Sequence, residues 1–342
     1  MINTMLFEKY NIKNMELKNR IVMPPMCMYT ADNQGYVNDW HMTHYTSRAI
    51  GQVGLIIVEA TAVVPNGRIS ANDLGIWDDS HINGLSKLVN ECQDKGTKMA
   101  LQLAHAGRKC GVNEVETVAP SSFDFSDKYS VPKEITKDEI KNVINAFKEG
   151  ARRADEAGFD AIEIHAAHGY LIHEFLSPIA NKRNDEYGGS LENRTRFLKE
   201  IIYSIKEVWP KEKPIWIRVS ADDYLEGGLE VKDIVDMINN IKEHIDMVHV
   251  SSGGIDIADI NVYPGYQVKY SETIKEKCYI PTIAVGWITN YEQSEEIISN
   301  HRSDLVALGR ELLRNPYWPI HEAMRKGIKI SIPEQYERAI KL

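Results

Sequence analysis

The feature that most constrains this chain is a repeated alternation of short apolar runs with segments of helical periodicity. Each run has the length of one buried strand. Eight strands that alternate with helices predict an α/β fold, a (β/α)8 TIM barrel that takes in residues 1–342 as a single domain. An open doubly wound sheet is the alternative, but no run is followed by G-x-G-x-x-G and no P-loop motif occurs. The runs are Arg20–Pro24, Gly54–Ala60, Met99–His105, Ala161–His165, Ile215–Ser220, Met247–Ser251, Thr282–Gly286 and Leu305–Gly309.

Alternation within the runs distinguishes a helix-facing side from a barrel interior. In the third run, Met99, Leu101 and Leu103 share one face, while Gln102 lies on the other. Polar interior side chains are therefore expected near the C-terminal ends of the strands, where active sites of such barrels lie.

Helix boundaries and two additional segments complete the expected fold. Thr136 and Glu139 form a capping box that opens a helix ending at Ala157, before Gly158. A second helix is expected from a cap at Ser190 through Trp209, before Pro210. Residues 1–19 should form an N-terminal hairpin that closes the barrel bottom. Residues 106–135 form a long loop after the third strand, interpreted as a lid over the pocket.

The charge balance and the cysteines exclude several classes of protein. Lys and Arg number 40 against 49 Asp and Glu, a formal net charge of −9, which argues against nucleic acid or an anionic membrane surface as partner. Four cysteines without a C-x-x-C pair indicate neither a disulfide framework nor an iron–sulfur or zinc cluster. The N-terminus lacks a signal-peptide core, and no run reaches the ~20 apolar residues of a membrane span. A reduced, cytoplasmic protein is the expectation.

The densest chemistry lies in the segment His165-Ala-Ala-His168-Gly169-Tyr170. A continuous strand would place the two histidines on opposite faces, so both reach one pocket only if the chain bends after His165, which Gly169 makes easy. Two neutral imidazoles that donate to one oxygen, beside a phenol, can stabilise an enolate while a carbon is protonated. The alternatives are structural histidines with a core tyrosine, and a zinc site that includes His173.

Gln102 and Arg218 end the strands that flank this segment. A permanently charged guanidinium next to an amide suits an electron-rich planar heterocycle that becomes anionic on reduction. The alternative is an interior Arg218 paired with Glu163.

The last strands end in residues suited to a phosphate. Glycines free backbone N–H groups there, and an arginine adds positive charge. These residues are Ser251-Ser-Gly253-Gly, Gly286 and Gly309-Arg310.

On these residues the chain resembles the Old Yellow Enzyme family of FMN-dependent ene-reductases, and within it the bacterial xenobiotic-reductase-like NADPH dehydrogenase branch. The resemblance covers essentially the whole chain. It is carried by Asn19–Tyr29 (NRIVMPPMCMY), Val58–Thr61 (VEAT), Gln102–Arg108 (QLAHAGR), His165–Pro178 (HAAHGYLIHEFLSP), Asn184–Arg194 (NDEYGGSLENR) and Ala307–Arg310 (ALGR).

The resemblance implies that FMN binds at the top of the barrel, and it assigns a role to each residue that matches the family's motifs. Pro24 departs from the branch, which commonly has a small polar residue there, and is left out of the site. Cys27, otherwise a small buried hydrophobe, would tune the flavin, where other branches have Thr. The expected flavin contacts are Pro25, Met26, Cys27, Ala60, Gln102 and Arg218 at the ring, and Ser251, Gly253, Gly286, Gly309 and Arg310 at the phosphate. The expected substrate contacts are Tyr29, Lys109, His165 and His168, with Tyr170 as the proton donor.

The implied activity is a ping-pong reaction. NADPH, with NADH as an alternative, reduces FMN, and hydride then passes from N5 to an α,β-unsaturated carbonyl compound, with nitro compounds as further candidates. No metal is expected. Other FMN-barrel dehydrogenases, a metal-dependent barrel lyase and a flavin-binding protein without turnover are the alternatives.

The resemblance also implies a homodimer or homotetramer. The tail, residues 333–342, would reach a neighbouring subunit, where Arg338 completes the substrate pocket. The alternative is an exposed terminal arginine.

Overall fold

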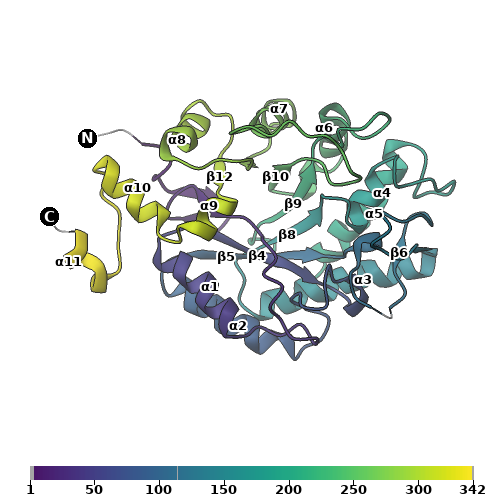
Figure 1. Ribbon diagram of the computed structural model, residues 1–342, viewed down its shortest axis with the longest axis horizontal. Helices are drawn as coiled ribbons and strands as arrows, with labels where there is room; N and C mark the ends of the chain where they lie inside the picture. Colours follow the sequence, from purple (N-terminus) through teal and green to yellow (C-terminus); the bar gives the residue numbers. More distant parts are fainter. Residues whose placement is uncertain (1–3, 114, 341–342) are drawn as a thin grey trace.

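The computed structural model, which describes residues 4–113 and 115–340, contains a closed barrel of eight parallel strands (Figure 1). Neighbouring strands follow the order β10-β11-β12-β3-β4-β5-β8-β9, so the chain runs round the barrel in sequence. This confirms the predicted (β/α)8 barrel. The strands are β3 (Ile21–Met23), β4 (Leu55–Ala62), β5 (Lys98–Ala104), β8 (Ala161–Ala166), β9 (Ile215–Ser220), β10 (Met247–Ser251), β11 (Thr282–Ala284) and β12 (Leu305–Ala307).

Helices surround the barrel, and their ends follow the sequence signals. In α3, Thr136 Oγ1 accepts from the Glu139 N–H, and Glu139 Oε2 accepts from the Thr136 N–H, so the capping box is confirmed. Gly158 ends this helix with a φ of 91°. The longer helices are α1 (Asp39–Ile50), α2 (His81–Gln93), α3 (Lys137–Glu156), α5 (Leu191–Lys206), α6 (Val231–Asn239), α7 (Val268–Cys278), α8 (Tyr291–Ser299) and α10 (Trp318–Lys326). The short ones are α4 (Leu171–Leu176), α9 (Gly309–Arg314) and α11 (Glu337–Ile340).

Two apolar cores confirm the two faces of the strands. Met99, Leu101 and Leu103 pack in the layer between strands and helices, whereas Ala100 belongs to a separate cluster inside the barrel. That inner cluster also contains Ile12, Met15 and Leu17 of the antiparallel hairpin formed by β1 (Tyr10–Ile12) and β2 (Met15–Leu17). The hairpin therefore supplies apolar side chains to the barrel interior, in line with its predicted role at the barrel bottom.

Some element ends differ from the prediction. The helix capped by Ser190 ends at Lys206, because the N–H groups of Val208 and Trp209 both donate to Ile205 O in a tight turn. The last two strands end at Ala284 and Ala307, so the glycines that follow them lie beyond the ladder. None of the helices within the described ranges is long and apolar enough to cross a membrane.

The long segment 106–135 is not structureless. It begins with the 3-10 helix η2 (Gly107–Lys109) and contains the paired short strands β6 (Val118–Ala119) and β7 (Lys133–Glu134). The Arg108 guanidinium donates to the carbonyls of Asp124 and Ile255, which joins this segment to the loop after β10. The bond to Ile255 O anchors segment 106–135, the predicted lid, at the C-terminal ends of the strands.

Candidate active site

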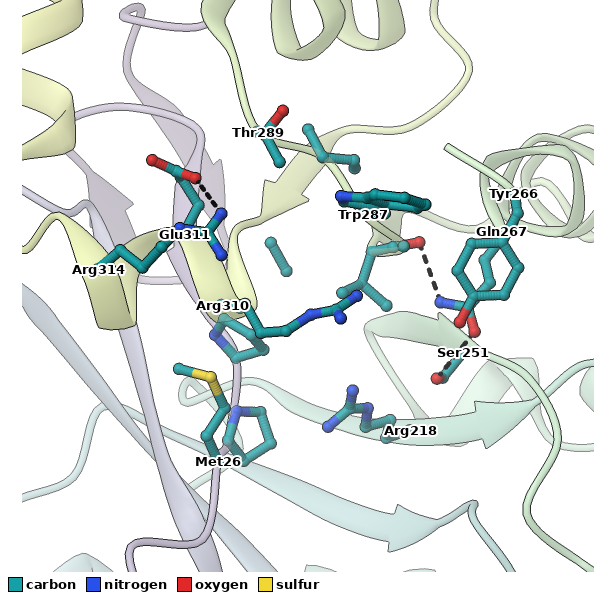
Figure 2. A pocket seen from close by; sticks show the side chains of 17 residues that line it. Met26, Arg218, Ser251, Tyr266, Gln267, Trp287, Thr289, Arg310, Glu311 and Arg314 are labelled. Carbon is teal, nitrogen blue, oxygen red and sulfur yellow. Dashed lines mark hydrogen bonds and ion pairs between the residues drawn. The ribbon is translucent and has the colours of Figure 1, made fainter. Parts of the chain in front are cut away.

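A cavity of about 440 Å³ opens at the C-terminal ends of β3, β9, β10, β11 and β12 (Figure 2). Its walls come from strand ends that lie far apart in the sequence, because a closed parallel barrel brings all of these ends to one rim. The predicted cofactor residues that line it are Pro25, Met26, Arg218, Ser251, Gly286, Gly309 and Arg310. Pro24, which the prediction left out, lines it as well.

The glycines beyond β11 and β12 shape this cavity. Gly286 has a φ of 131°, and a Cβ added there would lie 3.1 Å from the Gln267 side chain. A Cβ on Gly309 would clash with nothing and would extend toward Met26 Sδ, 3.7 Å away. Glycine therefore relieves crowding at the first position, whereas the second position has room for a Cβ in ordinary van der Waals contact.

The predicted histidine and tyrosine cluster is assembled beside the cavity. The ring centroids of His165 and His168 are 5.3 Å apart, and those of His165 and Tyr170 are 4.9 Å apart. The bend that the prediction required occurs at His168 and Gly169, whose φ values are 60° and 71°. His168 Nε2 lies 2.8 Å from Ser251 Oγ on the cavity wall, so the cluster and the cavity are contiguous.

Burial decides the protonation of this cluster. Desolvation, reinforced by the charge of Arg218, lowers the pKa values of His165 and His168 well below the ordinary value, so both imidazoles are neutral near pH 7. Desolvation also raises the pKa of Tyr170 above its ordinary value, so the phenol keeps its proton. The cluster thus contains neutral N–H and O–H donors close to the permanent positive charge of Arg218.

Tyr29 and Lys109 lie at the edge of this cluster. Lys109 Nζ donates to His168 O at 2.9 Å and lies 5.8 Å from the centre of the Tyr170 ring. Burial lowers the pKa of Lys109 to about 8. Tyr29 is 54% exposed, and burial of its hydroxyl end beside Cys27 raises its pKa to about 12. Both side chains therefore lie next to the cluster of His165, His168 and Tyr170.

Some predicted residues do not line the cavity. Cys27 contacts Tyr29 and the backbone of Ala60, and Gln102 is buried beneath, where its Nε2 donates to Glu163 Oε1 at 2.7 Å. Gly253 turns the chain after β10 and donates its N–H to Asp222 O. The expected alternative of an Arg218–Glu163 ion pair is also not formed, and Arg218 Nε is buried without a partner among the described residues.

Arg338 lies in α11, which Figure 1 shows at the outer end of the chain, away from the barrel rim. The tail contacts the rest of its own chain through Tyr336, whose ring centre lies 6.0 Å from that of Tyr317. The two last residues of the predicted tail, 341–342, lie outside the described part. The structure does not bring Arg338 to the site of its own chain.

The cavity has lining residues that the sequence did not point to. Gln267 donates to Val285 O and accepts from the hydroxyls of Ser251 and Ser252, and it reaches the site because the Gly265 N–H donates to Gly286 O. This bond joins the loop after β10 to the end of β11, a contact without a sequence signature. Further lining residues include Tyr266, Trp287 and Thr289.

His173 does not complete a metal site. Its Nδ1 accepts from the Gly169 N–H at 2.9 Å, and its Nε2 lies 3.0 Å from Asp223 Oδ1. Within residues 4–113 and 115–340, no group of three or more His, Cys, Asp or Glu side chains could hold a metal ion.

The sequence matches the NADH:flavin oxidoreductase / NADH oxidase family over residues 5–328. The chain belongs to this family, which includes Old Yellow Enzyme. It is 61% identical over 335 residues to an NADPH dehydrogenase of Clostridium acetobutylicum, with 98% of this chain and 99% of the relative covered. Morphinone reductase superposes with a TM-score of 0.80 at 28% identity, covering 97% of this chain and 92% of that one. An Old Yellow Enzyme homologue from Zymomonas mobilis superposes with a TM-score of 0.81 at 26% identity, covering 97% and 96% of the two chains.

The Old Yellow Enzyme family assignment identifies the protein as an FMN-dependent oxidoreductase with NADPH as reductant. The residues present fit this cofactor. Arg218 offers a buried guanidinium nitrogen without a partner among the described residues, and Gly309 and Arg310 both line the same cavity. A permanent cation suits a ring that becomes anionic, and a second cation suits a phosphate.

Proposed function

We propose that this enzyme reduces the C=C bond of α,β-unsaturated carbonyl compounds, with nitro compounds as further substrates. The observation that carries the proposal is the contact of His165, His168 and Tyr170 beside the cofactor cavity. Two neutral N–H donors are complementary to an oxygen that gains negative charge in the transition state. A neutral phenol next to them can supply the proton that the alkene carbon needs.

Hydrogen bonds support the donor role of both histidines. The Ala167 N–H donates to His165 Nδ1 at 3.4 Å, which leaves the ring hydrogen on Nε2. For His168, donation to substrate requires the Nδ1–H tautomer, in which the Ser251 hydroxyl gives its one hydrogen to His168 Nε2 at 2.8 Å and not to Gln267 Oε1 at 3.3 Å. Tyr29 and Lys109 border the substrate, and the Lys109 ammonium also fixes the His168 carbonyl.

FMN held in this cavity would supply the redox chemistry, which is hydride uptake from NADPH and hydride transfer to the alkene. Arg218 and Gln102 would hold the ring, together with Pro25, Met26, Ala60 and Cys27. The phosphate would lie against Arg310 and the backbone near Gly286 and Gly309. The further predicted contacts with the phosphate end are Ser251 and Gly253.

The tail is proposed to act between subunits of a homodimer or homotetramer. Arg338 is exposed and lies apart from its own site, which supports a role in a neighbour's pocket. An apolar groove of about 520 Å³ is formed by α10 and the residues that directly follow it, with Ile320, Met324 and Ile328 among its lining residues, and offers a second copy of the chain an apolar contact. All four cysteines are free, which supports the proposed location in a reducing cytoplasm.

Anaerobic reduction followed by an alkene tests the proposal. NADPH should bleach the yellow holoprotein, and cyclohexenone should restore the colour without oxygen. Another FMN-barrel dehydrogenase would bleach and stay bleached with cyclohexenone, an outcome that contradicts the proposal. A flavin-binding protein without turnover would not bleach.

A further inference from the structure

A buried polar cluster at the level of Gln102 has no part in the proposed proton transfer. Its centre is Glu163 on β8, which is fully buried. Glu163 Oε1 accepts from Gln102 Nε2, and Oε2 accepts from Trp216 Nε1 and from His249 Nδ1, each at 2.7 Å. Strands β5, β8, β9 and β10 each supply one member of the cluster.

The bond to Glu163 fixes the orientation of the Gln102 amide. Because Nε2 donates to the carboxylate, Oε1 is the Gln102 atom that has no partner among the described residues. An amide oxygen only accepts hydrogen bonds, and an oxidised isoalloxazine ring has one N–H donor on its edge. The Glu163 carboxylate therefore holds the Gln102 amide so that its Oε1 is available to accept a hydrogen bond from the flavin N–H.

Glu163 also contributes charge beside Arg218. Burial alone would raise the pKa of the Glu163 carboxyl, but the hydrogen bond from His249, the charge of Arg218 and the hydrogen bond from Trp216 outweigh it and hold the pKa below its ordinary value. Burial lowers the pKa of His249, so this ring is neutral and donates from Nδ1. The negative charge of Glu163 and the positive charge of Arg218 thus lie in the same low-dielectric interior, where charges interact strongly.

We propose that Glu163 is a positioning residue for the flavin, which orients Gln102 and offsets part of the positive charge of Arg218. It thereby sets the affinity for FMN and limits how far Arg218 favours the reduced, anionic ring. The inference rests on the proposed ring contacts of Gln102 and Arg218 and is independent of the alkene substrate.

The Glu163→Gln variant tests both parts. In this variant the side-chain NH2 group of residue 163 would face the NH2 group of Gln102, which is also a donor. Gln102 therefore has to turn its oxygen toward residue 163 and its NH2 group toward the flavin N–H. The FMN dissociation constant, measured by reconstitution of the apoprotein, should rise about tenfold. The midpoint potential should rise by about 30 mV, which corresponds to a tenfold gain of the reduced over the oxidised form in a two-electron couple.

Three further variants keep the test decisive. Trp216→Phe removes one donor but leaves the charge and the Gln102 bond, so both quantities should stay at wild-type values. Glu163→Asp keeps the negative charge but moves the carboxylate away from Gln102, so it should weaken FMN binding without raising the midpoint potential. This variant replaces Glu163→Gln in the test if Glu163→Gln does not fold. Gln102→Leu should weaken FMN binding, and unchanged binding there would remove the proposed ring contact and this inference with it. Wild-type potential and affinity in Glu163→Gln, or equal shifts in Trp216→Phe, would overturn the proposal.

Discussion

At the scale of single residues, the cluster of His165, His168 and Tyr170 depends on a backbone conformation that the surrounding side chains hold in place. His168 is a non-glycine residue in the left-handed region, an uncommon conformation that persists where its neighbours fix it. The His168 N–H donates to Ser220 Oγ at 3.0 Å, its carbonyl accepts from Lys109, and the next N–H, of Gly169, donates to His173. These three hydrogen bonds fix the backbone from which the His168 and Tyr170 side chains project.

Replacing both His165 and His168 by Ala should weaken the binding of phenolic ligands at least about 100-fold, since each lost hydrogen bond to a charged group is worth about 1.5–3 kcal/mol. Phenolate resembles the enolate and should be affected more than a neutral apolar ring of the same size. Titration followed by the charge-transfer absorbance of the flavin measures this. Equal losses for phenol and the apolar ring would contradict the oxyanion role.

Glu174 predicts a pH dependence of stability. Its Oε1 accepts from the Arg108 N–H at 2.9 Å and its Oε2 is buried without a partner among the described residues, and burial raises its pKa to about 8. Between the unfolded value and about 8 the folded state binds more protons, so stability falls as the pH rises through this range. Glu174→Gln should remove this loss, which is on the order of 4 kcal/mol for a shift of this size.

Urea unfolding of wild type and Glu174→Gln at pH 5.5 and pH 8.5 measures this effect. The stability of the variant relative to wild type should increase from pH 5.5 to pH 8.5. A constant difference between the two proteins across this range would show that Glu174 does not titrate as inferred.

At the scale of elements, the capping box of α3 contributes measurable stability. Thr136→Ala removes the acceptor for the Glu139 N–H and should cost about 1 kcal/mol in the free energy of unfolding. Thr273→Ala is the matched control, because Thr273 is only half-buried within α7 and its hydroxyl bonds only to Lys269 O in its own helix. A loss for Thr136→Ala no greater than that of the control would contradict the capping role.

The sequence was sufficient to predict the elements and most of one cavity wall. The period of two in β5 separated Gln102 from Leu101 and Leu103, and the closed order of strands then brought Arg218 and Gly286 to one rim. Gln267 and Trp287 could not be predicted in this way, because a loop-to-loop bond places the first and a positive φ of 50° accompanies the second. Neither feature has a periodic signal.

At the scale of the whole molecule, the tail is the part that the barrel does not explain. A chain ending at Pro333 should keep the barrel and its FMN but lose the proposed contact with a second subunit. We expect the KM for cyclohexenone to rise about tenfold and the dimer to weaken, as measured by steady-state kinetics and sedimentation. Arg338→Ala should raise the KM while the dimer persists. A truncated protein that stays dimeric with unaltered kinetics would refute the shared site.

The most direct test of the central proposal is stopped-flow analysis of Tyr170→Phe in both half-reactions. Phe has no proton to give, and general acid catalysis typically contributes about 10²–10⁴ in rate. Reduction of the bound FMN by NADPH should proceed at close to the wild-type rate, while reoxidation by cyclohexenone should slow by at least about 100-fold. Equal slowing of the two half-reactions, or an unchanged rate of reoxidation, would contradict the assignment of Tyr170 as the proton donor.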